Sequence, residues 1–167
     1  MNKRYRPMIR VGFYRWRTKR LIGFTLIEII VSLAILGILA SIAIPLYAGY
    51  IDKARTETCI ADIRSISSAL TTFFADNSTY PDSLAEVGYA TYRDCWGNNP
   101  YQYLNIKTAK STGSMRKDKF MVPINSDFDL YSMGKDGESA SPLTAQKSRD
   151  DIIRANDGAY IGPAYAF

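Results

Sequence analysis

Residues 24–44 form an apolar stretch in which Glu28 is the one charged residue. An α-helix needs about 20 apolar residues to cross the hydrocarbon core of a bilayer, so this stretch is long enough to span a membrane. A secretory signal has an apolar region of only about 7 to 15 residues and a small-residue cleavage site, which is missing here. We therefore predict a membrane anchor that stays on the chain. Glu28 then lies in lipid, where a lone charge costs about 2.5 to 3.5 kcal/mol, so it needs a compensating partner.

The residues around Glu28 form a motif. The run GFTLIE at residues 23–28 follows a basic leader and precedes the apolar stretch. It resembles the processing motif of type IV pilins and pseudopilins. The resemblance implies cleavage after Gly23 and N-methylation of Phe24 by a membrane-embedded prepilin peptidase and N-methyltransferase. It also implies that Glu28 and Pro45 serve filament assembly.

The spacing between the cleavage site and Glu28 also has a physical rationale. Cleavage creates an α-amino group that is positive near neutral pH and stays positive after one methylation. Glu28 lies about one helical turn away, so it can neutralise the amino group of its own chain or of a neighbour in an assembly. A buried charge that is paired is tolerated, whereas an unpaired one is not. The alternative is that Glu28 only reaches toward the lipid headgroups near the helix end.

The leader ahead of the motif is strongly basic. The chain has 21 basic and 16 acidic residues, and the part before residue 23 contains no acid. Its basic residues are Lys3, Arg4, Arg6, Arg10, Arg15, Arg17, Lys19 and Arg20. Directly before a membrane span, such a block predicts a cytoplasmic N-terminus, with residues 46 onward across the membrane. Interleaved aromatic residues also suit a nucleic-acid-binding segment, but the position favours the topological role, so we expect no nucleic-acid partner. Met1 and Met8 are alternative starts for this leader.

After Pro45 the pattern changes from uniformly apolar to amphipathic. Pro45 lacks a backbone N–H, which predicts a kink. One stripe of mostly apolar side chains then recurs at spacings of three and four residues: Cys59, Ile63, Ile66, Leu70, Phe73 and Asn77. This period predicts that one helix continues from residue 24 to residue 76 and packs this stripe against a globular head.

The remaining residues predict a small α+β head. The turn-forming run at 77–81 ends the long helix, and Asp82 or Ser83 caps a short helix that stops at Gly88. Short strand patterns follow at 101–107, 119–125 and 128–133. We predict an antiparallel three-stranded sheet across the long helix, followed by a long C-terminal loop.

Four segments follow from these predictions. They are a cleaved leader (1–23), a transmembrane helix (24–45), an amphipathic half-helix (46–76) and a head beyond the membrane (77–167).

Two runs in the head resemble the major pseudopilins of type II secretion: DCWGNNPYQY at 94–103 and DFDLYSMGKDG at 127–137. The resemblance implies a pseudopilin precursor in the bacterial inner membrane with its head in the periplasm. An ATP-driven assembly platform in that membrane would stack it with itself and with minor pseudopilins into a periplasmic filament that drives protein export. The main alternative is a subunit of a surface type IV pilus, for adhesion, motility or DNA uptake. Another is a signal-anchored binding domain that never polymerises.

The second resemblance also implies a calcium site in the loop after the last strand. Its ligands would be Asp136, Asp150 and Asp151, with the backbone carbonyl of Met133. Calcium prefers six to eight oxygen ligands, which carboxylates and carbonyls in a flexible loop supply. The link between Asp136 and Asp150 is longer than the family's usual one. Asp150 and Asp151 are alternatively the cap of a short helix at 152–155.

Cys59 and Cys95 are the two cysteines of the chain. Both would lie across the membrane, where oxidation is permitted. They are either a disulfide that joins the long helix to a loop or two buried free thiols.

The residues also limit the possible chemistry. The chain has no histidine, which excludes His-based triads and most zinc sites. It contains neither a phosphate-binding P-loop nor a G-x-S-x-G nucleophile motif. An Asp-based hydrolase would need two carboxylates in one pocket, which nothing in the sequence indicates. We therefore expect a structural protein and not an enzyme.

Overall fold

The computed structural model describes residues 23–97 and 99–167. The predicted leader up to residue 22, with its alternative start at Met8, lies outside the described residues, as does Asn98 of the first pseudopilin-like run. The chain divides into two compact units, Met1–Ala43 and Ile44–Phe167.

One long helix, α1 (Leu26–Asn77), takes up 52 residues and has Pro45 in its interior. The predicted bounds of 24 and 76 are thus confirmed to within two residues. The helix ends where its sequence turns polar, and the side-chain amide of Asn77 donates to the carbonyl of Phe73 at 2.9 Å. Pro45 does not end the helix, because a single missing N–H is tolerated when the flanking turns remain bonded.

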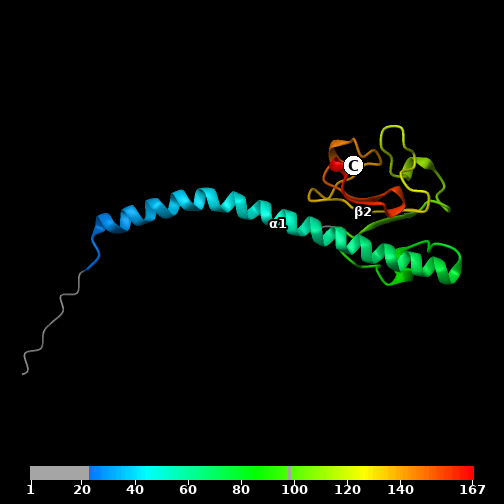
Figure 1. Ribbon diagram of the computed structural model, residues 1–167, viewed down its shortest axis with the longest axis horizontal. Helices are drawn as coiled ribbons and strands as arrows, with labels where there is room; N and C mark the ends of the chain where they lie inside the picture. The colour runs from blue at the N-terminus through cyan, green and yellow to red at the C-terminus, as the bar shows by residue number, and fades with distance from the viewer. Residues whose placement is uncertain (1–22, 98) are drawn as a thin grey trace, which may run out of the picture. The chain divides into compact units, whose positions relative to one another are not determined.

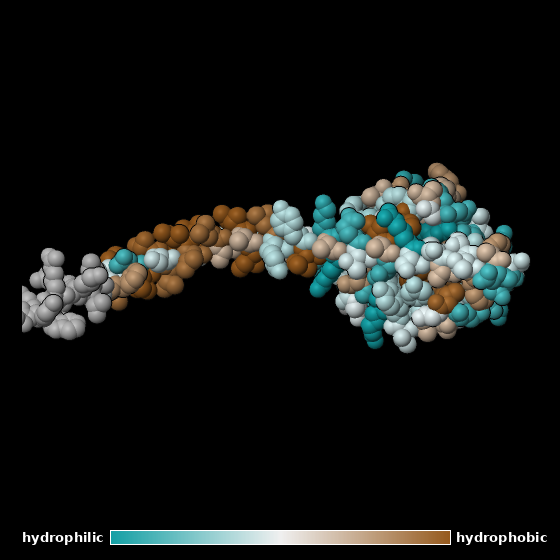
Figure 2. Space-filling model, turned by 60° about the horizontal axis from the view of Figure 1, so that its bottom comes forward, coloured by the Kyte–Doolittle hydropathy of each residue, from teal (hydrophilic) through white to brown (hydrophobic). Residues whose placement is uncertain are grey.

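In the first unit, all described residues are exposed. They include large apolar side chains such as Leu26, which is 81% exposed, and Ile38, which is 63% exposed. The apolar part of α1 accordingly forms a mostly brown surface in the view of Figure 2. By length and composition, α1 is the one helix among the described residues that qualifies as a membrane span. A helix that is apolar all round requires a nonpolar environment, and lipid provides one.

The second unit is built on the polar half of α1. Its stripe buries Cys59, Ile60, Ile63, Ile66 and Leu70. These side chains pack against the sheet and the loops that precede it, through Leu84, Tyr101, Phe128, Leu130 and Ile152. Each buried large aliphatic side chain contributes about 1.5 to 3 kcal/mol. The predicted stripe is confirmed from Cys59 to Leu70, whereas Phe73 is half-buried and Asn77 is exposed.

The sheet has four antiparallel strands in the order β1-β2-β3-β4. They are β1 (Gln102–Asn105), β2 (Phe128–Ser132), β3 (Ile152–Ala155) and β4 (Tyr160–Pro163). Tyr103 pairs with Leu130 between β1 and β2, Tyr131 with Ile153 between β2 and β3, and Arg154 with Ile161 between β3 and β4. Figure 1 shows the sheet beside the C-terminal half of α1. The α+β class and the antiparallel sheet are confirmed.

Two sequence predictions for the head are wrong. Residues 119–125 are not a strand: Lys119 has a positive φ of 42°, and Pro123 has no N–H to give to a sheet. Residues 152–155 are a strand and not a capped helix, because Ile152 and Ile153 are β-branched and fully enclosed between neighbours. The predicted C-terminal loop therefore contains β3 and β4, and the sheet has four strands and not three.

Short 3₁₀ helices connect these elements. The first, η1 (Leu84–Val87), ends at Gly88 with a φ of 85°, as predicted from the glycine. Glu86 caps its start by accepting the N–H groups of Asp82 and Ser83. The others are η2 (Thr112–Ser114), η3 (Gln146–Ser148), η4 (Asn156–Gly158) and η5 (Ala164–Ala166).

Candidate functional site

The motif at the start of α1 forms a capping box. The amide of Glu28 donates to Thr25 Oγ1 at 3.3 Å, and Thr25 donates from its amide to Glu28 Oε2 at 3.4 Å. The Thr25 hydroxyl also donates to Oε2 at 3.4 Å. A threonine followed three residues later by a glutamate is a known signal for this arrangement, and the sequence carried it. Glu28 is thus held at the first turn of α1 by long contacts that are easily exchanged.

The cleavage-site residues lie just ahead of this box. Gly23 and Phe24 are exposed and precede the first residue of α1. A Cβ atom added to Gly23 would contact nothing within 4 Å among the described residues. The fold of the described residues therefore makes no demand for a glycine at this position.

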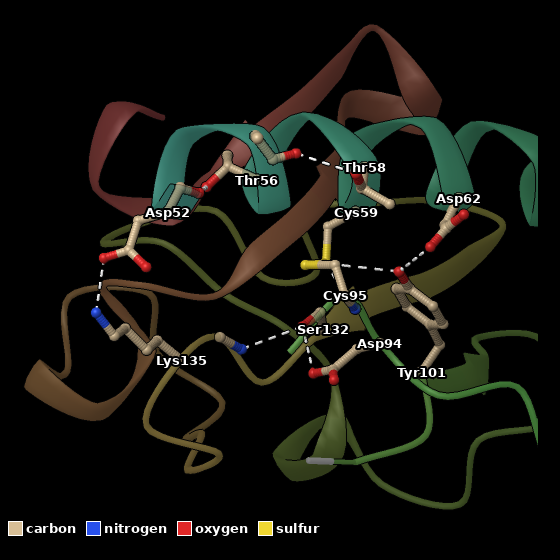
Figure 3. The surroundings of a disulfide bond; sticks show 12 residues. Asp52, Thr56, Thr58, Cys59, Asp62, Asp94, Cys95, Tyr101, Ser132 and Lys135 are labelled. Carbon is tan, nitrogen blue, oxygen red and sulfur yellow. Dashed lines mark hydrogen bonds and ion pairs between the residues drawn. A yellow bond between two sulfur atoms is a disulfide. The ribbon is translucent and has the colours of Figure 1, made fainter. Parts of the chain in front are cut away.

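A disulfide between Cys59 and Cys95 joins α1 to the loop before β1. Figure 3 shows the bond beneath the helix, next to the ring of Tyr101. Cys59 is fully buried. Of the two alternatives open at the sequence level, the disulfide is the one found.

Asp62 of α1 adds a polar connection beside the disulfide. Its carboxylate accepts the hydroxyl of Tyr101 at 2.8 Å and that of Tyr92 at 3.0 Å. Burial, followed by the hydrogen bond and charge of Asp62, raises the pKa of Tyr101 far above its usual value near 10. Lys135 pairs with Asp52, which lies closer to the N-terminus of α1 than Cys59 does. The distance is 2.6 Å, and Figure 3 shows this ion pair as well.

The structure brings the two pseudopilin-like runs together. The carboxylate of Asp94 accepts the hydroxyl of Ser132 at 2.9 Å. The side-chain amide of Asn99 donates to the carbonyl of Gly137 at 3.2 Å. The first run is therefore a support for the start of the loop that follows β2.

We call residues 133–151, which connect β2 to β3, the β2–β3 loop. It contains all the predicted calcium ligands, with half-buried Met133 directly after β2. Asp150 Oδ2 accepts the backbone N–H groups of Lys135 and Asp136, at 2.8 and 3.1 Å. Asp136 Oδ1 accepts the N–H of Glu138 at 2.8 Å. Both carboxylates thus stabilise turns of the loop backbone.

Asp151 is fully buried and pairs with a cation. Its Oδ2 atom lies 2.5 Å from a terminal nitrogen of Arg116, which is itself only 2% exposed. The hydroxyl of Ser139 donates to the same oxygen. Burial raises the pKa of Asp151 to about 6, against the opposing effects of Ser139 and Arg116. The buried guanidinium of Arg116 is the group that compensates this carboxylate.

The predicted calcium ligands are not gathered around one point. Among residues 23–97 and 99–167, no three acidic side chains lie close enough together to hold one metal ion. Oxygens of Asp136 and Asp150 face N–H donors, and Asp151 faces a guanidinium. Asp151 Oδ1 is buried without a hydrogen-bond partner among the described residues. Calcium binding by this set stays a prediction.

Two buried arginines were missed at the sequence level. Arg116 belongs to a polar stretch that reads as solvated loop, yet its guanidinium lies 4.2 Å from the ring centre of Tyr131. Arg154 of β3 makes a two-pronged pair with Asp127, at 2.8 and 2.7 Å, and lies over the ring of Phe128. No local pattern marks either residue, because their partners are distant in the chain.

Comparison with known families agrees with the motif and with the head. The model for the type II secretion system (T2SS) protein G family matches residues 47–150. The prokaryotic N-terminal methylation motif matches residues 21–44.

Relatives that cover about three quarters of the chain or more include two members of this family and one fimbrial protein. The chain is 34% identical to the type II secretion system core protein G of Aeromonas hydrophila, across 74% of this chain and 89% of the relative. It is 44% identical to that of Pectobacterium carotovorum subsp. carotovorum, across 78% of this chain and 81% of the relative. It is also 28% identical to a fimbrial protein of Neisseria meningitidis, across 81% of this chain and 79% of the relative.

Proposed function

Because the chain belongs to the type II secretion system protein G family, whose members are structural subunits of the secretion pseudopilus, we propose how it enters that filament. It is inserted in the inner membrane with its N-terminus in the cytoplasm. It is then cleaved after Gly23, methylated at Phe24 and assembled through Glu28. The family supports this role over that of a surface pilus subunit, and over an enzyme.

The proposed topology rests on charge and hydropathy. The basic leader precedes the exposed apolar part of α1. A transmembrane potential and anionic lipids favour such a leader on the cytoplasmic side. The second unit, with its disulfide, then faces the oxidising periplasm, which is where a structural disulfide forms and persists.

The proposed processing rests on the methylation motif and on the exposure of its residues. Gly23 and Phe24 lie ahead of α1, so a peptidase can bind them in an extended conformation. Since a Cβ at Gly23 would meet nothing in the described residues, the glycine serves the peptidase and not the fold. A prepilin peptidase and N-methyltransferase is the partner that this chemistry requires.

The observation that carries the proposal is an ionisable side chain on an uncovered apolar helix. Glu28 is exposed, and its contacts with Thr25 use Oε2 at a long 3.4 Å. Cleavage places a new positive amino group at Phe24, one turn away. Glu28 exchanges its weak contacts for this amino group, in its own chain or in the neighbour that it joins. Pairing removes the free-energy penalty of an isolated charge in a nonpolar environment. Assemblies in which Glu28 is paired with an amino group are therefore favoured over assemblies in which it is unpaired.

The second unit supplies rigidity in the filament. Its core is built on α1 itself, through Ile63, Ile66 and Leu70, and the disulfide adds a covalent connection. A force applied along α1 is therefore transmitted to the head. Such a rigid connection suits a subunit of a filament that moves exported proteins. An inner-membrane platform adds this subunit to the filament together with minor pseudopilins.

The test is Glu28→Gln, which keeps the shape of the side chain and removes its charge. Glu57→Gln is the matched control, because Glu57 is an exposed glutamate of the same helix outside the apolar part. We expect Glu28→Gln to insert and to be cleaved normally, but to yield at least tenfold less sheared filament than wild type. Glu57→Gln should yield wild-type amounts. Equal filament yields from Glu28→Gln and wild type would refute the pairing role.

A further inference from the structure

We propose that the guanidinium of Arg116 is the cation that organises the β2–β3 loop in this chain, so that the loop is ordered without calcium. The family resemblance implied a calcium site in this loop. The contacts of the described residues point instead to an ordering side chain that enters the loop from outside, from the segment after η2. This inference concerns the fold of the head and does not depend on how the subunit assembles.

Arg116 gathers oxygens from two separate parts of the loop. One terminal nitrogen donates to Ser139 Oγ at 2.6 Å and to the carbonyl of Ala140 at 2.7 Å. The other donates to Asp151 Oδ2 at 2.5 Å. The guanidinium also lies over the ring of Tyr131 at 4.2 Å. A carboxylate, a carbonyl and a hydroxyl around one positive centre are the oxygen types with which calcium is bound.

The backbone around Arg116 holds it in this position. Its own N–H donates to the buried carboxylate of Asp129 at 2.7 Å. Next to it, the N–H of Lys117 donates to the carbonyl of Ser141 at 3.1 Å, and the N–H of Leu143 donates to the carbonyl of Lys117 at 2.9 Å. The segment carrying Arg116 is thus bonded along the loop, and its side chain is preorganised. The fixed fork of a guanidinium suits such a set of oxygens better than a flexible ammonium does.

The other predicted ligands already serve the same loop without a metal. Asp150 Oδ2 faces two N–H groups and Asp136 Oδ1 faces one. Both lone pairs of Asp150 Oδ2 thus face N–H groups, so a metal ion at this oxygen would have to displace a donor. Asp151 Oδ1 is buried without a hydrogen-bond partner in the described part of the chain, but a divalent cation there would meet the positive charge of Arg116 on the same carboxylate. Two cations this close repel each other strongly in a buried site.

Hydrogen exchange of the full chain in detergent micelles tests the proposal. Amide exchange in the β2–β3 loop is measured by mass spectrometry in excess EGTA and in millimolar calcium chloride. We expect the exchange rates of the loop to agree within twofold, because the ordering cation is part of the chain. A site at 100 times its dissociation constant would slow exchange about 100-fold. Slowing by tenfold or more in calcium would overturn the proposal.

Three variants make the test specific. Arg116→Met should speed exchange of the β2–β3 loop at least tenfold, whereas Arg149→Met, at an exposed arginine of the same loop, should leave it within twofold. Asp136→Asn should leave the rates the same in EGTA and in calcium. Unchanged loop exchange in Arg116→Met would overturn the proposal. If Arg116→Met does not fold, the exchange rates of wild type and Asp136→Asn in EGTA and in calcium decide alone. Calcium-dependent protection of the loop that is present in wild type and absent in Asp136→Asn would contradict the proposal.

Discussion

Removing the Cys59–Cys95 disulfide should destabilise the second unit strongly. We consider the double variant Cys59→Ala/Cys95→Ala, because alanine avoids placing a new hydroxyl at the fully buried position of Cys59. The bond connects residues 36 positions apart, and it joins the helix that carries the core to the loop that leads into β1. Without the bond, the unfolded chain gains conformational freedom. The other core contacts of the folded state stay in place.

The magnitude follows from chain entropy. Closing a loop of this length removes about 13 cal/mol/K from the unfolded state, which corresponds to about 4 kcal/mol at 25 °C. For a unit of this size, each kcal/mol moves the midpoint of thermal unfolding by about 4 °C, so the midpoint should fall by about 15 °C. A loss of about 4 kcal/mol is a large part of the free energy of unfolding of a typical domain, which is about 5 to 15 kcal/mol.

The assay is denaturant unfolding of the full chain in detergent micelles, followed by near-ultraviolet circular dichroism. Wild type with a reducing agent should unfold at the same denaturant concentration as the double variant in either redox state. Each single variant should lose as much free energy of unfolding as the double variant, because either substitution removes the disulfide. A loss below about 1 kcal/mol would refute the entropic reasoning. So would a reducing agent that leaves the wild-type midpoint unchanged.

Three further predictions follow from single residues. Gly23→Ala should leave the stability of the second unit unchanged but block processing, visible as a heavier precursor on a gel; normal processing would contradict the peptidase role of the glycine. Gly134→Ala should cost about 1 to 3 kcal/mol in denaturant unfolding, because its φ is 68° and its Cβ would lie 2.6 Å from the carbonyl of Asp150. Tyr101, whose pKa is raised by burial and by Asp62, favours its neutral form in the folded state, so stability should fall as the pH rises above about 10, by about 1.4 kcal/mol per pH unit. Tyr101→Phe should show a slope shallower by that amount between about pH 11 and 12, where the tyrosine of the unfolded chain is almost fully ionised, and equal slopes would contradict the assignment.

The long helix and its motif were predictable because they are encoded locally. Uniform apolarity marked the first half of α1, and spacings of three and four residues marked the face from Cys59 to Leu70. The Thr25–Glu28 capping box also has a local signal, which is the spacing of three residues between the threonine and the glutamate. Such patterns report on neighbours within one or two turns, so they need no knowledge of the rest of the fold.

The head was predicted less well because its strands are short. Residues 119–125 have strand-like composition, but Pro123 cannot take part in a ladder. Residues 152–155 look like the start of a capped helix after Asp150 and Asp151, yet they pair with β2 and β4. A segment of four residues is too short for its periodicity to distinguish a helix from a strand. Packing against distant parts of the chain determines that residues 152–155 form a strand.

The amino-acid sequence alone determined the apolar segment long enough to span a membrane, the N-terminal methylation motif, the long helix and the family resemblance. Only the tertiary structure decided that Cys59 is bonded to Cys95 and that Asp151 pairs with Arg116. The partners in that pair are 35 positions apart, and the choice between an internal and a bound cation depends on which side chain reaches the buried carboxylate. A buried charge such as that of Asp151 must be compensated by a cation. Where that cation comes from is a property of packing, which no local pattern encodes.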